Sequence, residues 1–150
     1  MKIRLLKKKD IEKIMEIIKE WKKESSIISW DKRKKVEEVL RRSPKTCWVV
    51  EINKKIIGFR LVIDDIQNRA WARLTVISKK YRRKGIGSLL IREVDRKLKK
   101  MGFRKVYAQT SYKNIASINW HLKSGYRKVT LLRDWYKKGR HGILFIKNLD

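Results

Sequence analysis

The sequence contains one cysteine, Cys47, one proline, Pro44, and only 15 acidic residues among 150. A single cysteine excludes an internal disulfide and is typical of proteins made in a reducing compartment, so we expect a cytoplasmic location. No run approaches the roughly 20 apolar residues that a membrane-spanning helix needs. The charged residues Lys2 and Arg4 interrupt the first segment too early for a signal peptide. We therefore expect a soluble protein without membrane association.

Basic residues outnumber acidic ones by a wide margin. The 42 Lys and Arg residues give a formal net charge of +27. A positive field of this size attracts polyanions such as nucleic acid, an acidic protein or the phosphates of a cofactor. The alternative is a Lys-rich background composition of thermophilic type, although that enrichment normally raises Glu together with Lys.

The chain length fits one folded domain. A sequence of 150 residues can close a single hydrophobic core but is short for two. The hydrophobic fraction of 42%, with six Trp, five Tyr and three Phe, excludes disorder caused by low hydrophobicity. We see no internal repeat or linker and expect one domain over residues 1–150.

Hydrophobic periodicity predicts the order β, α, α, β, β, β, α, β, α, β, β. Antiparallel hairpins in the first half and a strand, helix, strand crossover in the second predict an α/β (α+β) fold: one mixed, mostly antiparallel sheet of about seven strands with helices on both faces. The predicted strands are a short one at Ile3 and Leu5, then Cys47–Ile52, Ile56–Ile63, Ala70–Ile77, Phe103–Thr110, Tyr126–Leu132 and Gly142–Ile146; the predicted helices run from an Asp10 cap to about Glu20, from an Asp31 cap to Ser43-Pro44, from Gly85 to Gly102 and over Asn114–Lys123.

A basic, glycine-containing segment lies between a predicted strand and the strongest predicted helix. Gly85 and Gly87 let a ligand approach the backbone, and the first turn of a helix leaves about four N–H groups without partners. A diphosphate can accept hydrogen bonds there at the positive end of the helix dipole. The alternative is a basic turn that binds no ligand. The residues of this candidate site are Arg82, Arg83, Lys84, Gly85, Ile86, Gly87 and Ser88.

Two other phosphate-binding loops do not fit this segment. A P-loop needs a Lys directly after its second Gly, and Ser88 follows Gly87 here. A dinucleotide fingerprint needs a third Gly three residues after Gly87, where Leu90 stands.

The segment resembles the signature of the GNAT superfamily of N-acetyltransferases, [Arg/Gln]-x-x-Gly-x-[Gly/Ala] after a hydrophobic strand. Arg82, Gly85 and Gly87 match that signature in register. Lys79 and Arg83 stand where many relatives have Pro and Gly, which makes the loop more basic without removing a phosphate-binding N–H.

A second signature region of the superfamily is also similar to this sequence. Two motifs in order, about the expected distance apart, are more specific than either alone. The resemblance covers roughly residues 47–126, and the first 45 residues only in their strand, helix, helix pattern. The matching residues are Asn114, Ala116, His121, Gly125 and Tyr126.

The resemblance implies the acyl-CoA N-acyltransferase fold and acetyl-CoA (coenzyme A) as the cofactor. In that superfamily the strand before the loop splays from its neighbour, and the gap accepts the pantetheine arm. By register, the backbone of Val76 and Ile77 would pair with this arm and polarise the thioester carbonyl. Asn114 would cap the helix it opens and also contact the cofactor.

The resemblance assigns the proton donor for the leaving thiolate to His121, which stands where the superfamily usually has Tyr. An imidazole with a pKa near 6.5 can do this only if its pKa is raised. The alternatives are that the thiolate leaves unaided and that His121 only shapes the pocket. Tyr112 is the second candidate donor. No carboxylate occurs on the strand before the loop, so the base is either Glu51, Asp64 or Asp65 on the preceding hairpin or ordered water.

The predicted function is acetyl transfer to a primary amine on a protein N-terminus, a lysine or a small metabolite. The +27 charge disfavours polycationic acceptors and favours a neutral or acidic one. The alternative is a basic nucleic-acid- or ribosome-associated module that uses the same fold, because basic runs and interspersed aromatics suit backbone contacts but show no readout motif. A homodimer is a further candidate assembly, and no metal ligand is assigned.

Overall fold

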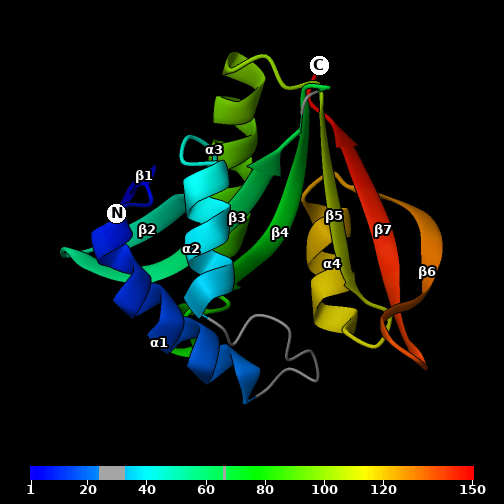
Figure 1. The fold of residues 1–150 in the computed structure, drawn as a ribbon, viewed down its shortest axis with the longest axis horizontal. Helices are drawn as coiled ribbons and strands as arrows, with labels where there is room; N and C mark the ends of the chain where they lie inside the picture. The colour runs from blue at the N-terminus through cyan, green and yellow to red at the C-terminus, as the bar shows by residue number, and fades with distance from the viewer. Residues whose placement is uncertain (24–32, 66) are drawn as a thin grey trace.

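The computed structural model describes residues 1–23, 33–65 and 67–150. Seven strands form one sheet in the order β1-β2-β3-β4-β5-β7-β6 (Figure 1), and only β4 and β5 run parallel. This confirms the predicted mixed, mostly antiparallel sheet. The strands are β1 (Lys2–Leu5), β2 (Trp48–Ile52), β3 (Lys55–Asp64), β4 (Arg69–Ile77), β5 (Lys105–Ser111), β6 (Arg127–Lys137) and β7 (Arg140–Asn148).

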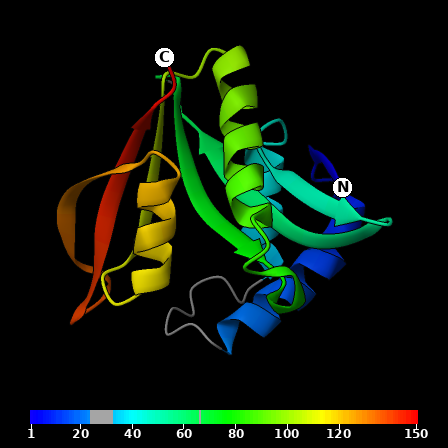
Figure 2. The ribbon, with the colours of Figure 1, turned by 180° about the vertical axis from the view of Figure 1, so that it is seen from behind.

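Helices cover both faces of the sheet, as predicted. Helices α1 and α2 lie over one face (Figure 1), and α3 and α4 lie over the other (Figure 2). The bounds are α1 (Ile11–Lys22), α2 (Arg33–Arg42), α3 (Ile86–Lys100) and α4 (Ile115–Lys123), with single 3-10 turns η1 (Lys8–Asp10) and η2 (Lys79–Tyr81). No helix in the described ranges has the length and apolar character needed to cross a bilayer.

Each face has its own hydrophobic core. Under α1 and α2, the helix residue Ile14 packs in one buried cluster with Phe59 and Leu61 of β3. Under α3, Leu90 and Val94 belong to a second cluster that includes β-strand residues and Ile118 of α4. Full burial of one such side chain contributes about 1.5–3 kcal/mol, so these two clusters fix the sheet between its helix layers.

The β2–β3 hairpin closes as the sequence predicts. Asn53 and Lys54 form its turn with φ values of 50° and 64°. A two-residue turn of type I′ requires positive φ at both central positions, and it matches the right-handed twist of the flanking strands. The turn sets the pairing next to it, and a bulge at Ile57 then shifts the register for the rest of β3.

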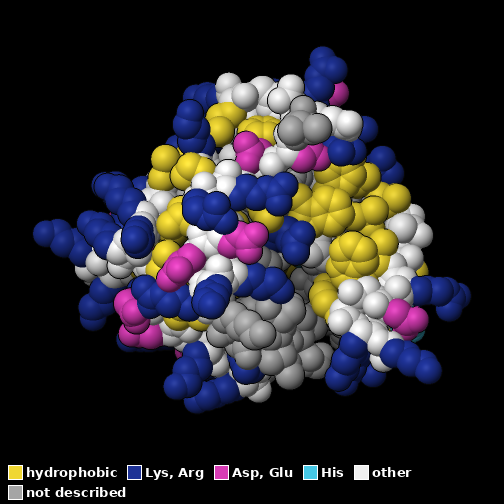
Figure 3. Space-filling view, in the orientation of Figure 1, with side chains coloured by type: hydrophobic (Ala, Val, Ile, Leu, Met, Phe, Trp, Pro, Cys, Tyr) yellow, Lys and Arg dark blue, Asp and Glu magenta, His cyan; other side chains and the backbone are white. Residues whose placement is uncertain are grey.

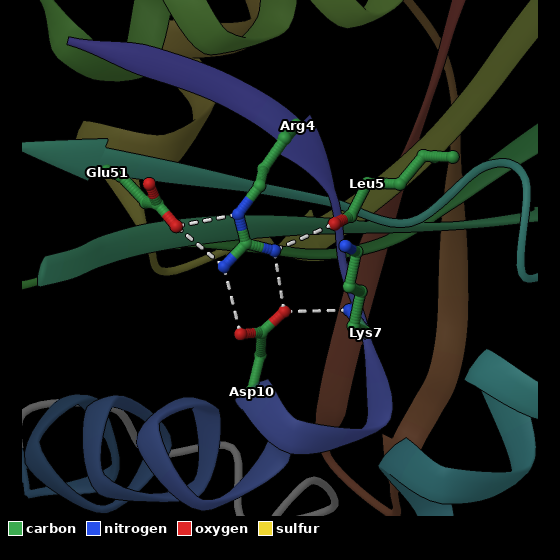
Figure 4. Close-up of polar contacts among 5 residues, drawn as sticks. All are labelled: Arg4, Leu5, Lys7, Asp10 and Glu51. Carbon is green, nitrogen blue, oxygen red and sulfur yellow. Dashed lines mark hydrogen bonds and ion pairs between the residues drawn. The ribbon is translucent and has the colours of Figure 1, made fainter. Parts of the chain in front are cut away.

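Asp10 does not cap α1 in the predicted way. The turn η1 precedes α1, and the Asp10 carboxylate instead accepts the Lys7 N–H at 2.7 Å and the Arg4 guanidinium at 2.8 and 3.0 Å (Figure 4). Arg4 also donates to Glu51 at 2.6 Å. Burial alone raises the pKa of Asp10, but the hydrogen bonds from Arg4 and Lys7 outweigh it and lower that pKa below 3.8. This cluster ties β1 to β2 and to the start of α1.

The other described boundaries lie within two residues of the predicted ones or extend beyond them. Helix α2 ends at Arg42, directly before Ser43-Pro44, as predicted; the proposed cap Asp31 lies outside the described residues. Strand β6 extends past the predicted end at Leu132 to Lys137, and β7 extends past both predicted ends. The predicted hairpin is too short because β6 lies at the edge of the sheet. Most of its side chains are exposed, so the apolar alternation that marks a strand is missing there.

Candidate functional site

Strands β4 and β5 pair over four residues and then part. Their register runs from Arg69↔Lys105 to Ala72↔Ala108. At that point β4 carries a bulge: Val62 of β3 faces Ala72 and Leu61 faces Leu74, so Arg73 is an extra residue. A bulge bends its strand and increases the local twist, which explains why the two strands diverge at their lower ends in Figure 1. Residues 73–77 of β4 therefore have an open edge toward β5.

The β3–β4 ladder determines which backbone groups face this opening. Ser78 N–H donates to the Ile57 carbonyl at 2.8 Å. In an antiparallel pair, alternate residues direct their N–H and C=O groups to the partner strand. The register therefore turns the backbone groups of Val76 toward β3 and those of Thr75 and Ile77 toward the opening. Of the two predicted residues, Ile77 has the expected backbone direction and Val76 does not, because the ladder with β3 uses its backbone groups.

The open edge leads directly to the start of α3. Gly85 is the N-cap residue with φ 76°, and no side chain caps the helix. The first helical bond runs from Leu89 N–H to the Gly85 carbonyl at 3.0 Å, so the N–H groups of Ile86, Gly87 and Ser88 precede the bonded ladder. The helix thus begins where the sequence predicts, with donors available at its positive end.

Gly87 lies against an aromatic ring of α4. A Cβ atom at this position would be 2.6 Å from Cζ2 of Trp120, so only glycine fits without moving the indole. The Trp120 ring therefore packs against the first turn of α3 on the side that faces α4. Nothing in the sequence spacing of Gly87 and Trp120 indicates this contact.

The three cations of the loop have different positions. The Arg82 Nε donates to the Ile77 carbonyl at 2.7 Å and so joins the loop to the end of β4. Arg83 is exposed with φ 60°, and exposed Lys84 has its ammonium 5.7 Å from the ring centroid of Tyr81. Arg83 and Lys84 are therefore accessible to an anion at the helix terminus.

His121 does not meet the condition for a proton donor. It is 7% exposed, stacks on Phe145 with ring centroids 4.9 Å apart, and donates its Nδ1–H to the Ser117 carbonyl at 2.7 Å. Burial, aided by the nearby Arg60 charge, lowers the pKa of His121 to about 4. The imidazole is neutral at pH 7 and therefore lacks the extra proton that a general acid would donate. This geometry agrees with the alternative in which His121 packs in the interior and does not act as the acid.

The second signature region has a clear local role. The Asn114 side chain caps α4 by accepting the Ser117 N–H at 3.0 Å, which confirms the predicted cap. Tyr112 follows β5, and its ring lies 5.2 Å from that of His141. It is half-buried beyond the end of the β4–β5 pairing.

The three candidate bases are engaged elsewhere. Glu51 accepts from Arg4 at the β1 side of the sheet. Asp64 accepts the Ser43 hydroxyl at 2.6 Å, and Asp65 accepts the Arg69 guanidinium at 2.8 Å. The last two lie where β3 passes to β4, at the closed end of the β4–β5 pairing. None of the three lies along the open part of β4.

A buried polar cluster that the sequence did not suggest lies on the α3 side of the same strand. Arg60 of β3 is 0% exposed and donates to the Thr75 hydroxyl at 2.7 Å and to the Tyr126 hydroxyl at 2.6 Å. Asp95 of α3 lies 3.7 Å from Arg60 and accepts the Lys147 ammonium at 2.8 Å. The available signal was a charged residue in the middle of the otherwise apolar strand β3.

The chain is similar to known acetyltransferases. Residues 11–126 match the family described as "Acetyltransferase (GNAT) family". N-alpha-acetyltransferase 30 from Dictyostelium discoideum is 26% identical over 116 residues, a match that covers 74% of this chain and 62% of that relative. The chain thus covers less than two thirds of that relative's length.

Solved structures share the fold. Ard1 from Thermoplasma volcanium superimposes with a TM-score of 0.87 and 19% identity, over 98% of this chain and 96% of that one. The structure of yncA from Salmonella typhimurium with its cofactor acetyl-CoA gives a TM-score of 0.84 and 18% identity, over 100% and 94% of the two chains.

Proposed function

Because the chain belongs to the acetyltransferase (GNAT) family, which uses acetyl-CoA, we propose that it transfers the acetyl group of acetyl-CoA to a primary amine. One observation carries this proposal: the open edge of β4 beyond Ala72 is followed, after the basic loop over residues 78–84, by the uncapped N-terminus of α3. The first feature offers backbone groups to an extended chain, and the second offers backbone donors to a diphosphate.

The residues of the open edge and the loop divide the binding between them. The N–H groups of Ile86, Gly87 and Ser88 bind the diphosphate, and Arg83 and Lys84 add charge. Toward the bulge, the N–H of Ile77, whose carbonyl accepts from Arg82, and the backbone groups of Thr75 pair with the pantetheine arm. Acetyl-CoA supplies a thioester, whose carbonyl is attacked by the amine. An N–H of the open edge is a fixed dipole that stabilises the charge that develops on that carbonyl oxygen.

Proton removal from the amine falls to water in this proposal. Glu51, Asp64 and Asp65 are held by other side chains away from the opening. An aliphatic amine with a pKa near 10.4 is mostly protonated at pH 7, whereas a protein α-amine has a pKa near 8. Because none of these three carboxylates lies at the opening, the proposed reaction favours an acceptor that is already partly deprotonated, an α-amine. The name of the Dictyostelium relative, an N-alpha-acetyltransferase, supports the same acceptor.

The net charge further limits which acceptor amines the protein can use. In Figure 3, Lys and Arg side chains gather over the part of the visible face where α1 and α2 lie, whereas hydrophobic side chains gather on the right of the view. A formal charge of +27 repels polycationic acceptors, so we propose a protein N-terminus whose neighbouring residues are neutral or acidic. Association with nucleic acid or with a ribosome stays a prediction from charge alone.

Labelled acetyl-CoA and two peptides test this function. One peptide has a free N-terminal amine and no lysine, and the other has a blocked N-terminus and one lysine. We expect cofactor binding in calorimetry at low and moderate salt, and label only on the first peptide. Absence of acetyl-CoA binding would refute the proposed activity, and label on the lysine peptide alone would refute the α-amine acceptor.

A further inference from the structure

The buried cluster around Arg60 contains more positive than negative charge. Arg60 and Lys147 share the single carboxylate of Asp95, at 3.7 and 2.8 Å. Arg60 is fully buried, and its Nε has no hydrogen-bond partner among the described residues. A buried cation with an unused donor favours an additional anion close by, because burial makes an uncompensated charge costly.

Thr75 connects this cluster to the open edge of β4. Arg60 and Thr75 are direct cross-strand neighbours, and the Arg60 guanidinium donates to the Thr75 hydroxyl at 2.7 Å. The hydroxyl oxygen accepts this bond, so its own hydrogen is left for another acceptor. The Thr75 side chain is half-buried, and its backbone groups face the opening two residues after the bulge residue Arg73.

The proposed function brings one anion to this place. A diphosphate bound at the start of α3 would place the arm along β4 from Ile77 toward the bulge, and Thr75 lies about 7 Å along that edge at roughly 3.3 Å per residue. The open edge would then hold the reacting end beside Thr75. The side chains of Thr75 and Arg60, which share the α3 side of the sheet, would face its sulfur.

The sulfur needs stabilisation that His121 does not give. A thiol has a pKa near 8.5, and a thiolate is stabilised by nearby cations and hydrogen-bond donors. His121 is neutral and its Nδ1–H is held by the Ser117 carbonyl. The Thr75 hydroxyl, polarised by Arg60, is a donor on the correct side of β4.

We propose that Thr75 and Arg60 form a thiolate subsite for the leaving coenzyme A, an inference that rests on the proposed function. As the C–N bond forms and the C–S bond breaks, the electron pair goes to sulfur, the Thr75 hydroxyl donates a hydrogen bond to it, and the amine proton goes to water. No protein group needs to protonate the sulfur. Thr75 contacts the leaving atom, and Arg60 is a positioning residue that acts through it.

The thiol pKa of bound coenzyme A tests the subsite without knowledge of the acceptor. Coenzyme A is added in less than stoichiometric amount, and thiolate absorbance is followed against pH for the wild type and for Thr75→Val, Thr75→Ser and Arg60→Met. We expect the bound thiol to ionise about one pH unit lower than the free thiol, which is a tenfold change in its ionisation constant. Thr75→Ser should keep this shift, whereas Thr75→Val and Arg60→Met should lose most of it.

Thr46→Val is the matched control. The Thr46 hydroxyl is buried and donates to the Val62 carbonyl at 2.6 Å, away from the opening, so its loss should destabilise the fold without changing the thiol pKa. If Arg60→Met does not fold, the Thr75 pair decides. Coenzyme A bound with an unshifted thiol pKa in the wild type, or with the same shift in Thr75→Val, overturns the subsite alone. Absence of binding to the wild type overturns the proposed function as well.

Discussion

Replacing Gly85 by Asp tests the role of the α3 N-terminus directly. Gly85 has φ 76°, and a Cβ there meets no atom within 4 Å, so the side chain fits but the backbone is strained by roughly 1–2 kcal/mol. Gly102, at the other end of the same helix, has φ 96° and equally open surroundings. Gly102→Asp is therefore a matched control. The helix dipole favours a carboxylate at Gly85 and disfavours it at Gly102, so the Gly85 variant should be at least as stable as the control.

The same carboxylate should weaken coenzyme A binding. Two unit charges 4 Å apart repel by about 1 kcal/mol in water and about 4 kcal/mol at an effective dielectric constant of 20. For an exposed position beside a diphosphate we take about 2 kcal/mol, which corresponds to a roughly 30-fold weaker Kd. Isothermal titration with coenzyme A, at equal ionic strength for both variants, measures this. A Gly85→Asp protein that binds within threefold of the wild type, or a control that loses as much affinity, would refute the assignment of the diphosphate to this helix terminus.

Three further substitutions test packing and ionisation. Gly87→Ala places a Cβ 2.6 Å from the Trp120 ring and should lower the free energy of unfolding, measured by urea titration, by about 1–3 kcal/mol. The double variant Gly87→Ala/Trp120→Leu should recover stability, and an equal loss in the double variant would contradict the clash. The pKa of His121 is about 4 in the folded protein and 6.5 in the unfolded chain, so the free energy of unfolding falls as pH drops from 6.5 toward 4, by roughly 2.5 kcal/mol at pH 4.5. His121→Leu should lack this pH-dependent loss of stability. An unchanged pH dependence in His121→Leu would show that the residue is not buried in its neutral form. Asp10→Asn should lower the free energy of unfolding by about 2 kcal/mol at pH 7. Because the folded pKa of Asp10 lies below 3.8, this difference in stability from the wild type should disappear as pH falls through the folded pKa. A difference that stays constant with pH would contradict the ion pair.

Much of the fold could be predicted because local patterns and global packing agree. The Asn53-Lys54 turn, the glycine that opens α3 and the Asn114 cap each have a specific local cause, namely positive φ or a side-chain hydrogen bond. The edge strand β6 was underestimated because its side chains face solvent on most of its length. A hydrophobic period marks buried positions, and an edge strand with mostly exposed side chains shows little of that period.

The candidate site was predicted in its loop and less well along its strand. Glycine spacing located the start of α3, but the backbone direction of Val76 and Ile77 depends on register, and the extra residue Arg73 shifts that register in a way that no sequence pattern shows. Arg60 and Thr75 meet across two strands, a contact set by pairing. His121 matched a motif, yet its ionisation is set by burial against Phe145 and Tyr126, which only the packing reveals.

Four residue pairs between β4 and β5 join the β1–β4 part of the sheet to the β5–β7 part. An extended ligand bound in the opening would contact strands on both sides of this pairing. Ligand binding should therefore stabilise the association of the two parts of the sheet as well as the folded state. Saturation should then merge two sequential hydrogen-exchange opening events, in which β5–β7 separate before β1–β4, into one cooperative event.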